Sequence, residues 1–358
     1  MKIILSGGGT LGPVTPLLAI YEVLSEQYRD AEFIWIGTKY GPERQLIEEK
    51  KIKFLSFSSG KLRRYVSLGN IPDIFRVIAG LLESFIFLKK EKPDLCISAG
   101  GFVSVPVHWA AGLLRIPAWV HQQDVRVGLS NKLMAPFAKV ITTALRQNVK
   151  NFSKRKTVWL GNPTRHDIFL GSKDRAIKLF GLKKNLPVVF VTGGGTGSES
   201  VNKIVSESIS QLDGVCEVIH LSGKDRPNEM VNNIANQYDY YHTYKFFTYE
   251  MKDAYAIADI IISRGGFGTL VEMAGLGKAA VVIPIPGHQE ENVELLAEEE
   301  AVILVDQRIG SGVQLAGLIK ELLSDRDRME NMGNKLHALL PVAKKDGILD
   351  IFNKLIKT

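Results

Sequence analysis

The chain has 358 residues, of which 45% are hydrophobic and 23% charged, and its formal net charge is +7. This composition is typical of a soluble globular protein with two domains of ordinary size. No apolar run reaches the roughly 18 residues that a membrane-spanning helix needs, and the first residues do not resemble a signal peptide. The positive charge favours an anionic partner, and no basic motif interleaved with aromatic residues points to nucleic acid.

Short apolar runs that predict strands alternate with helical patterns along the chain. The first series is KIILSG, AEFIWIGT, DLCISAG, PAWVHQQ and KVITTA, and the second is PVVFVTGGG, CEVIHLSG, ADIIISRGG, AAVVIPIP and AVILVD. Short strands that are apolar on both faces and separated by helices predict parallel sheets covered on both sides. The expected fold class is therefore α/β, with two Rossmann-like doubly wound parallel-sheet domains. The carboxyl ends of the two sheets are expected to face each other across a cleft.

The boundary between these domains is expected near residues 159–174, where a glycine, an asparagine and a proline interrupt the regular pattern. We expect one domain over residues 1–160 and a second over 161–341. Residues 342–358 alternate apolar and charged positions at helical spacing, and we expect that helix to pack back on the first domain. Cys96 and Cys216 lie far apart in apolar runs, so we expect buried thiols rather than a metal site, which fits a reducing compartment.

The first strand runs directly into a glycine-rich turn. Gly7, Gly9 and Gly12 have the G-x-G-x-x-G spacing that suits a phosphate held by backbone N–H groups at a helix start. A dinucleotide site also needs an acidic residue at the end of the second strand, and that strand ends in Gly37 and Thr38. The spacing therefore predicts a phosphate-facing loop more than a dinucleotide site.

Two further glycine clusters follow strands in the second half, at residues 193–197 and 263–269. Each precedes a helix, so its backbone amides can donate to a phosphate. Glu272 lies about one turn into the helix after the second cluster. A carboxylate at that position can accept hydrogen bonds from two vicinal hydroxyls, as a ribose presents them. A nucleotide in the second domain is therefore expected.

These motifs together resemble the MurG family of UDP-N-acetylglucosamine transferases. GGGTLGPVTP resembles its first glycine loop, SGKLRRYVS its basic loop, and residues 98–138 its central signature. GNPTR is similar to its interdomain segment, and GGGTGS, RGGFGTLVE and HQEEN to its donor-binding motifs. The resemblance implies a GT-B fold and an inverting transferase that needs no metal and no cofactor. It would move N-acetylglucosamine from UDP to the 4-hydroxyl of the N-acetylmuramoyl unit of lipid I, giving lipid II in peptidoglycan synthesis.

The resemblance also implies partners and a location. The partners are UDP-N-acetylglucosamine, undecaprenyl-linked lipid I, an anionic membrane surface and other proteins of cell-wall synthesis. The location is peripheral, at the cytoplasmic face of the plasma membrane. Two alternatives stay open: a UDP-sugar transferase with another glycolipid acceptor, such as diacylglycerol, and a catalytically weak protein that binds nucleotide sugars.

By the same resemblance the donor lies mainly in the second domain. Arg165 meets the nucleotide, Thr248 lies where backbone groups read the uracil edge, and Glu272 binds the ribose hydroxyls. The other residues implied for substrate binding are Gly195 near the phosphates, Phe267, Gly268, Thr269, Leu270 and Val271 along the diphosphate and ribose, Gln289 and Asn292 on the sugar, and Thr10, Leu11, Gly12 and Asp124 closing from the first domain.

Two motifs depart from the family pattern. The loop that usually reads GGTGGH is GGTLGP here, so Leu11 replaces a glycine and Pro13 replaces a histidine that is a candidate for the catalytic base. The central HEQN is HQQD, which loses a glutamate at Gln122 and gains a carboxylate at Asp124. Our hypothesis is that Asp124 or His121 acts as the base, because both lie at a strand end that is expected to face the cleft.

The segment from residue 71 to 94 is apolar around more than one helix face and is followed by lysines. A core helix needs only one apolar stripe, so the wide arc favours contact with an anionic bilayer surface. The residues expected in that contact are Ile74, Ile78, Leu82, Phe85, Ile86, Lys89 and Lys90.

Overall fold

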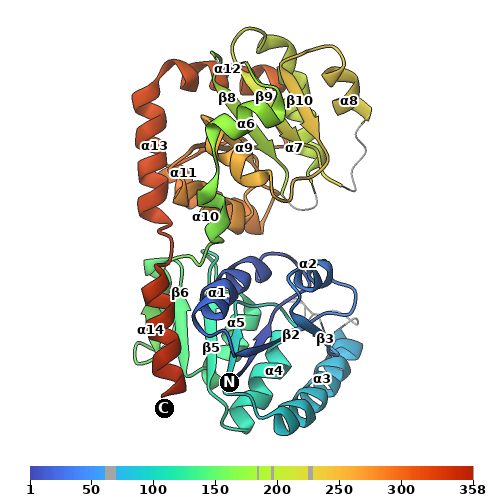
Figure 1. Ribbon diagram of the computed structural model, residues 1–358, viewed down its shortest axis with the longest axis vertical. Coiled ribbons are helices and arrows are strands. Elements are labelled where there is room, and N and C mark those ends of the chain that lie inside the picture. Colours follow the sequence, from blue (N-terminus) through green and yellow to red (C-terminus); the bar gives the residue numbers. More distant parts are fainter. Residues whose placement is uncertain (61–69, 184, 195–196, 225–228, 358) are drawn as a thin grey trace. The chain divides into compact units, whose positions relative to one another are not determined.

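The computed structural model describes residues 1–60, 70–183, 185–194, 197–224 and 229–357 (Figure 1). The chain forms two compact units, one of residues 1–165 with 342–358 and one of residues 166–341. Each unit is built around one sheet in which every strand pairs in parallel with its neighbours. The predicted α/β class with two Rossmann-like doubly wound sheets is confirmed. How the two sheets face each other stays a prediction.

In the part of the chain that is described, the first unit holds a seven-stranded sheet in the order β3-β2-β1-β4-β5-β6-β7. The chain order reverses between β1 and β4, so the loops after these two strands flank the switch point, where ligands bind in such sheets. The strands are β1 (Lys2–Ser6), β2 (Glu32–Gly37), β3 (Lys53–Ser56), β4 (Leu95–Ser98), β5 (Ala118–Gln122), β6 (Val140–Thr143) and β7 (Thr157–Trp159).

Helices cover both faces of this sheet because successive strand residues point to opposite sides. Ile3 and Leu5 pack with α1 and α14, whereas Ile4 between them packs with α3 and α4. The helical segments are α1 (Val14–Gln27), α2 (Glu43–Glu49), α3 (Asn70–Glu91), α4 (Ser104–Leu113), α5 (Leu129–Met134), η1 (Ala135–Phe137), η2 (Arg146–Asn151) and α14 (Lys345–Ile356).

The C-terminal helix α14 packs against α1 in the first unit. The Tyr28 hydroxyl donates to Asn353 Oδ1 at 2.6 Å, and the rings of Tyr28 and Phe352 lie 4.9 Å apart. Ile348, Ile351, Phe352 and Leu355 are all buried, so the alternating pattern of the C-terminal segment supplies one apolar stripe. The last helix of the chain therefore completes the core around its first strand.

Among the described residues, the second unit holds a six-stranded sheet in the order β10-β9-β8-β11-β12-β13, which reverses between β8 and β11. Its strands are β8 (Val188–Thr192), β9 (Glu217–Leu221), β10 (Tyr241–Tyr244), β11 (Ile260–Ser263), β12 (Ala279–Val282) and β13 (Ile303–Leu304). Its helical segments are η3 (His166–Leu170), α6 (Lys173–Phe180), α7 (Glu199–Ser208), η4 (Ile209–Gln211), α8 (Glu229–Ala235), α9 (Met251–Ile257), α10 (Phe267–Gly275), α11 (His288–Glu298), α12 (Gly312–Ser324) and α13 (Arg326–Leu339).

Candidate functional site

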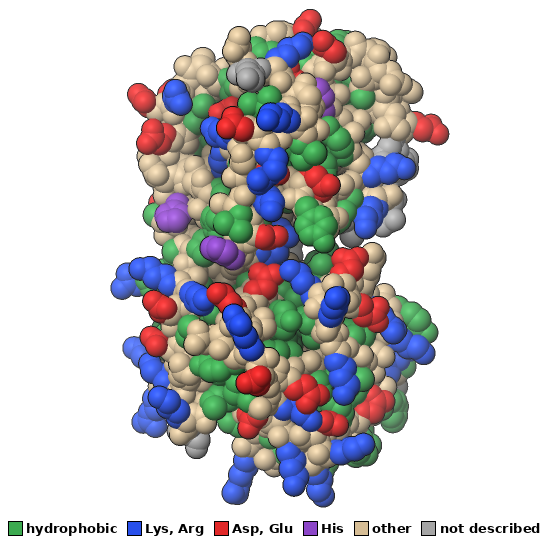
Figure 2. Space-filling model, in the orientation of Figure 1, with side chains coloured by type: hydrophobic (Ala, Val, Ile, Leu, Met, Phe, Trp, Pro, Cys, Tyr) green, Lys and Arg blue, Asp and Glu red, His purple; other side chains and the backbone are tan. Residues whose placement is uncertain are grey.

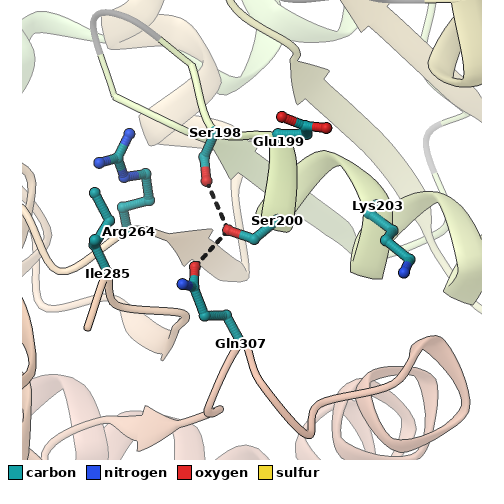
Figure 3. A pocket seen from close by; sticks show the side chains of 7 residues that line it. All are labelled: Ser198, Glu199, Ser200, Lys203, Arg264, Ile285 and Gln307. Carbon is teal, nitrogen blue, oxygen red and sulfur yellow. Dashed lines mark hydrogen bonds between the residues drawn. The ribbon is translucent and has the colours of Figure 1, made fainter.

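A cavity of about 420 Å³ opens at the carboxyl ends of the second sheet (Figure 3). Residues from the loops after four neighbouring strands line it: Ser198 follows β8, Arg264 follows β11, Ile285 follows β12 and Gln307 follows β13. Its remaining lining residues, Glu199, Ser200 and Lys203, belong to α7. Since the sheet order reverses between β8 and β11, the cavity lies where a doubly wound fold binds its ligand.

The cavity presents hydroxyl groups at the start of a helix. Ser198 caps α7 by accepting a hydrogen bond from the Val201 N–H, and its hydroxyl lies 3.1 Å from that of Ser200. The Ser200 hydroxyl donates to Gln307 Oε1 at 2.7 Å, as Figure 3 shows. Helix N-termini attract anions, and the exposed Lys203 lies one turn further along α7. This end of the cavity suits an anionic ligand such as a phosphate.

Arg264 joins the two glycine clusters of the second unit. Its Nη1 donates to the carbonyl of Gly197 at 2.9 Å, which holds the end of the loop after β8. A side chain at Gly265 would come within 2.6 Å of Val293, so the turn after β11 packs tightly on α11. Gly195, expected near the phosphates, lies outside the described residues.

Helix α10 carries the residues that were expected along the diphosphate and ribose. Gly268 and Thr269 are half-buried, whereas the side chains of Phe267, Leu270 and Val271 are buried in the core. The inward side chains stabilise α10, so contact with a ligand at these three positions is limited to the backbone.

Glu272 is 6% exposed, and its Oε2 accepts a hydrogen bond from the Tyr255 hydroxyl at 2.8 Å. The sequence indicated Glu272 as a candidate but gave no sign of this tyrosine, which lies on α9.

The remaining expected donor residues lie on loops and on α11. Gln289 Oε1 accepts from the Ile285 N–H at 3.2 Å, so this side chain fixes a loop that lines the cavity. Asn292 is 2% exposed, one turn further along α11. Thr248 is exposed in the loop after β10, and its N–H donates to Glu250. Arg165 is half-buried at the end of the first unit's main segment.

In the first unit, the glycine loop after β1 lies against a second glycine pair after β4. A side chain at Gly101 would meet the carbonyl of Gly8 at 2.8 Å, and Gly101 has a φ of +91°. Only glycine combines this close approach with that backbone conformation. The loop then continues through the exposed Thr10 to Pro13, which directly precedes α1.

Glu43 is the residue of this region that sequence reasoning missed. It is fully buried: its Oε1 accepts from the Thr38 N–H at 2.7 Å and the Thr38 hydroxyl at 2.6 Å, and its Oε2 accepts from the Gly9 N–H at 3.2 Å. A side chain at Gly8 or Gly41 would come within 2.1 Å of this carboxylate. An acidic group does therefore lie near the end of the second strand, but it holds the glycine loop itself.

The expectation that His121 faces a cleft is wrong. The side chain of His121 is fully buried, and its Nδ1 lies 2.9 Å from the hydroxyl of Thr142 on the neighbouring strand. Burial also lowers the pKa of His121 to about 3. A ring enclosed in this way cannot reach a substrate hydroxyl, so Asp124, which is half-buried, is the candidate base that remains.

The loop that carries Asp124 is held by buried amides. Gln122 accepts a hydrogen bond from Asn131 at 2.7 Å and donates to the Asp124 carbonyl at 2.9 Å, and Asn148 donates to the same carbonyl at 2.7 Å. The Gln123 amide donates to the carbonyl of Gly12 at 3.1 Å. These bonds tie the loop of Asp124 to the first glycine loop, so the structure brings two of the sequence motifs together.

Both halves of the chain match models of one enzyme family. Residues 3–143 match the glycosyltransferase family 28 N-terminal domain, and residues 188–346 match the glycosyltransferase family 28 C-terminal domain. The chain belongs to glycosyltransferase family 28. It is therefore a glycosyltransferase, and the resemblance drawn from its glycine motifs is confirmed.

Two curated relatives of this family 28 chain carry the same enzyme name. A UDP-N-acetylglucosamine--N-acetylmuramyl-(pentapeptide) pyrophosphoryl-undecaprenol N-acetylglucosamine transferase of Clostridium perfringens is 33% identical over 96% of this chain and 98% of its own length. The enzyme of the same name from Clostridium botulinum is 34% identical over 99% of this chain and 98% of its own. The crystal structure of Acinetobacter baumannii MurG shares the fold, with a TM-score of 0.76 at 23% identity over 99% of each chain.

The family 28 chain also carries an exposed apolar stripe on α3, which we call the α3 stripe. Its members recur every fourth residue and are half to two-thirds exposed: Ile74, Ile78, Leu82 and Ile86. The opposite side of α3 packs inward through Val77 and Leu88. Figure 2 shows hydrophobic side chains along the edge of the first unit where α3 lies.

One expected member of this surface lies elsewhere. Phe85 is half-buried and packs against the core beneath α3 and α4, so it is not part of the α3 stripe. Lys89 and Lys90 are exposed at the end of the helix. The basic loop predicted at residues 59–67 lies almost wholly outside the described residues. Within the described ranges, no helix has the length and apolar character needed to cross a membrane.

Proposed function

We propose that this glycosyltransferase moves N-acetylglucosamine from UDP to undecaprenyl-linked lipid I, giving lipid II. The observation that carries the proposal is that relatives 33% and 34% identical over nearly the whole chain are named for this transfer. The cavity at the switch point of the second sheet supports the donor half, because a helix N-terminus and a lysine favour a diphosphate there. The volume of the cavity also falls in the range of small-molecule sites.

We assign the donor contacts from the resemblance of the motifs. Glu272 accepts from the ribose hydroxyls, Gln289 and Asn292 bind the sugar, and Arg165 and Thr248 meet the nucleotide. UDP leaves with a growing negative charge as the bond between the sugar and the diphosphate breaks. The N-terminus of α7 and nearby cationic side chains stabilise that charge in the transition state.

The acceptor half depends on Asp124. The 4-hydroxyl of the N-acetylmuramoyl unit passes its proton to this carboxylate while its oxygen attacks the anomeric carbon from the face opposite UDP, which inverts the configuration. Pro13 has no group that accepts a proton. The hydrogen bonds of Gln122 and Asn148 to the Asp124 carbonyl fix the backbone at this position.

The membrane contact is assigned to the α3 stripe, and with it a peripheral position on the cytoplasmic face of the plasma membrane. A lipid-linked acceptor requires the enzyme to dock at a bilayer. Four exposed apolar side chains followed by Lys89 and Lys90 suit an anionic lipid surface.

The test is transfer of labelled N-acetylglucosamine from UDP to a short-chain lipid I analogue, with EDTA present. We expect product from the wild type, a loss of about a hundredfold or more in kcat for Asp124→Asn, and full activity for the exposed control Asp30→Asn. Product from Asp124→Asn at the wild-type rate removes Asp124 as the base. No product from the wild type, with UDP-N-acetylglucosamine still bound in calorimetry, assigns the chain to another acceptor or to a binding role.

A further inference from the structure

We propose that Gln307 and Ile285 recognise the 2-acetamido group of the donor sugar, so that the second unit prefers UDP-N-acetylglucosamine to UDP-glucose. The Gln307 amide nitrogen donates to the acetamido oxygen, and the acetamido methyl group packs against the side chain of Ile285. The proposal rests on the proposed function, in which this unit binds the donor. It adds the residues that read the one group by which the two nucleotide sugars differ.

Both residues line the cavity of about 420 Å³ in the second unit. Gln307 lies in the loop after β13 and is half-buried, and Ile285 lies in the loop after β12 and is 38% exposed. Figure 3 shows the Gln307 side chain reaching toward Ser200, with its amide nitrogen turned to the side on which Ile285 is drawn. The cavity therefore offers a ligand one amide donor and one apolar side chain.

A chain of hydroxyl groups sets the orientation of the Gln307 amide. The Ser200 hydroxyl donates to Gln307 Oε1 at 2.7 Å, so the Ser198 hydroxyl, 3.1 Å from it, donates to Ser200. Ser198 in turn accepts from the Val201 N–H of α7, which ties the chain to the helix backbone. Hydrogen bonds in such a chain polarise one another. With Oε1 occupied by Ser200, the amide presents Nε2, for which no protein group within the described ranges is an acceptor.

The pairing of these two side chains suits an acetamido group. Such a group has a carbonyl oxygen that accepts from an amide N–H and a methyl group that gains from apolar contact. A phosphate has only charged oxygens and gains nothing from Ile285. UDP-glucose carries a hydroxyl at the same ring position, so it lacks the methyl group and the carbonyl that reaches beyond the ring. An oriented Gln307 beside Ile285 therefore favours the acetamido sugar.

The cavity adjoins the residues assigned to the sugar. Gln289 Oε1 accepts from the Ile285 N–H at 3.2 Å, so this residue of α11 holds the loop that carries Ile285. A side chain at Gly265 would come within 3.1 Å of the Gln289 carbonyl, so the turn after Arg264, which also lines the cavity, packs on the start of the same helix. A sugar bound at Gln289 therefore has the loop of Ile285 beside it.

The experiment measures calorimetric binding of UDP, UDP-glucose and UDP-N-acetylglucosamine to the full chain. We expect the wild type to prefer UDP-N-acetylglucosamine to UDP-glucose by about tenfold or more. Gln307→Met keeps the length of the side chain without the amide, so it should weaken UDP-N-acetylglucosamine about five- to tenfold and leave UDP and UDP-glucose unchanged. Ile285→Ala should weaken the same ligand about three- to fivefold. Ser200→Ala frees the amide to rotate, so it should lower the preference about two- to fivefold and have no further effect when added to Gln307→Met.

Gln314→Met is the matched control, because Gln314 is an exposed glutamine of α12 in the same unit and does not line the cavity. It should leave all three affinities unchanged. If Gln307→Met weakens UDP-glucose as much as UDP-N-acetylglucosamine, or weakens neither, the assignment of the acetamido group is overturned while the proposed function stands. Failure of the wild type to bind UDP-N-acetylglucosamine overturns both.

Discussion

Replacing Glu43 by alanine tests whether its buried carboxylate holds the first glycine loop in place. The change leaves three donors without their acceptor: the Thr38 N–H, the Thr38 hydroxyl and the Gly9 N–H, now at 2.7, 2.6 and 3.2 Å from the carboxylate. Each unsatisfied buried donor costs about 1–3 kcal/mol. The hydroxyl can rotate to another acceptor and water can enter the space, so we expect a total loss of about 3–5 kcal/mol.

Tryptophan fluorescence measures this loss in the first unit alone, because all four tryptophans of the chain lie there: Trp35, Trp109, Trp119 and Trp159. Urea unfolding followed by this signal should show a lower midpoint for Glu43→Ala. The matched control is Glu48→Ala on the same helix, since that side chain is 51% exposed and pairs with the exposed Arg44. We expect the control to lose less than about 1 kcal/mol. Equal losses for the two variants would refute the assigned role of Glu43.

Three further predictions follow from single contacts. Gln122→Met cannot donate to the carbonyl of Asp124, so kcat should fall about ten- to a hundredfold with UDP affinity unchanged. An unchanged kcat would show that this hydrogen bond does not support the loop of Asp124. Leu82→Ser with Ile86→Ser should abolish sedimentation with anionic vesicles at low salt without moving the urea midpoint, and sedimentation that persists excludes the α3 stripe. Burial lowers the pKa of His121 from 6.5 to about 3, so only the unfolded chain takes up its proton in that range. The contribution of His121 to stability is then full above about pH 6.5 and falls by roughly 1 kcal/mol per pH unit as the pH drops toward about 3. His121→Gln should reduce the slope of stability against pH, measured by tryptophan fluorescence, by that amount. An unchanged slope would contradict the lowered pKa assigned to His121.

The sequence predicted the inner strands of both sheets because a strand buried on both faces is a nearly continuous apolar run. The strands it missed are β3, β7 and β10, with sequences KFLS, TVW and YHTY. Among the residues that the structure describes, all three lie at sheet edges, where one side has no partner strand and the side chains are partly exposed. Such residues carry no continuous apolar signal, so only pairing with a neighbouring strand reveals them.

In the candidate site, the sequence predicted the positions of the glycine loops but not the side chains that contact them. Glycine spacing indicates a backbone conformation, and the glycine loops at residues 7–12 and 193–197 do follow β1 and β8, which are strands at the switch points of the two sheets. A side-chain partner depends on which distant residue the fold brings near. Glu43 reaches Gly9 across 34 positions, and Tyr255 reaches Glu272 across 17. The prediction for His121 failed for the same reason, because the strand end is polar in sequence, while the buried imidazole contacts the Thr142 hydroxyl on the neighbouring strand.

The glycine loops that follow β1 and β8 differ in what surrounds them. In the first unit the Gly9 N–H is already bound by the chain's own Glu43, whose negative charge lies where an anion would approach that amide. In the second unit the corresponding strand leads into the capped N-terminus of α7, beside an open cavity and the exposed Lys203. The backbone amides at the start of α7 and the side chain of Lys203 favour an anion there, and Glu199 in the first turn of the same helix opposes it. In the proposed function we assign UDP to the second unit, whereas the first loop, whose Gly9 N–H is already bound by Glu43, supports the loop of Asp124 through the hydrogen bond from Gln123 to the Gly12 carbonyl.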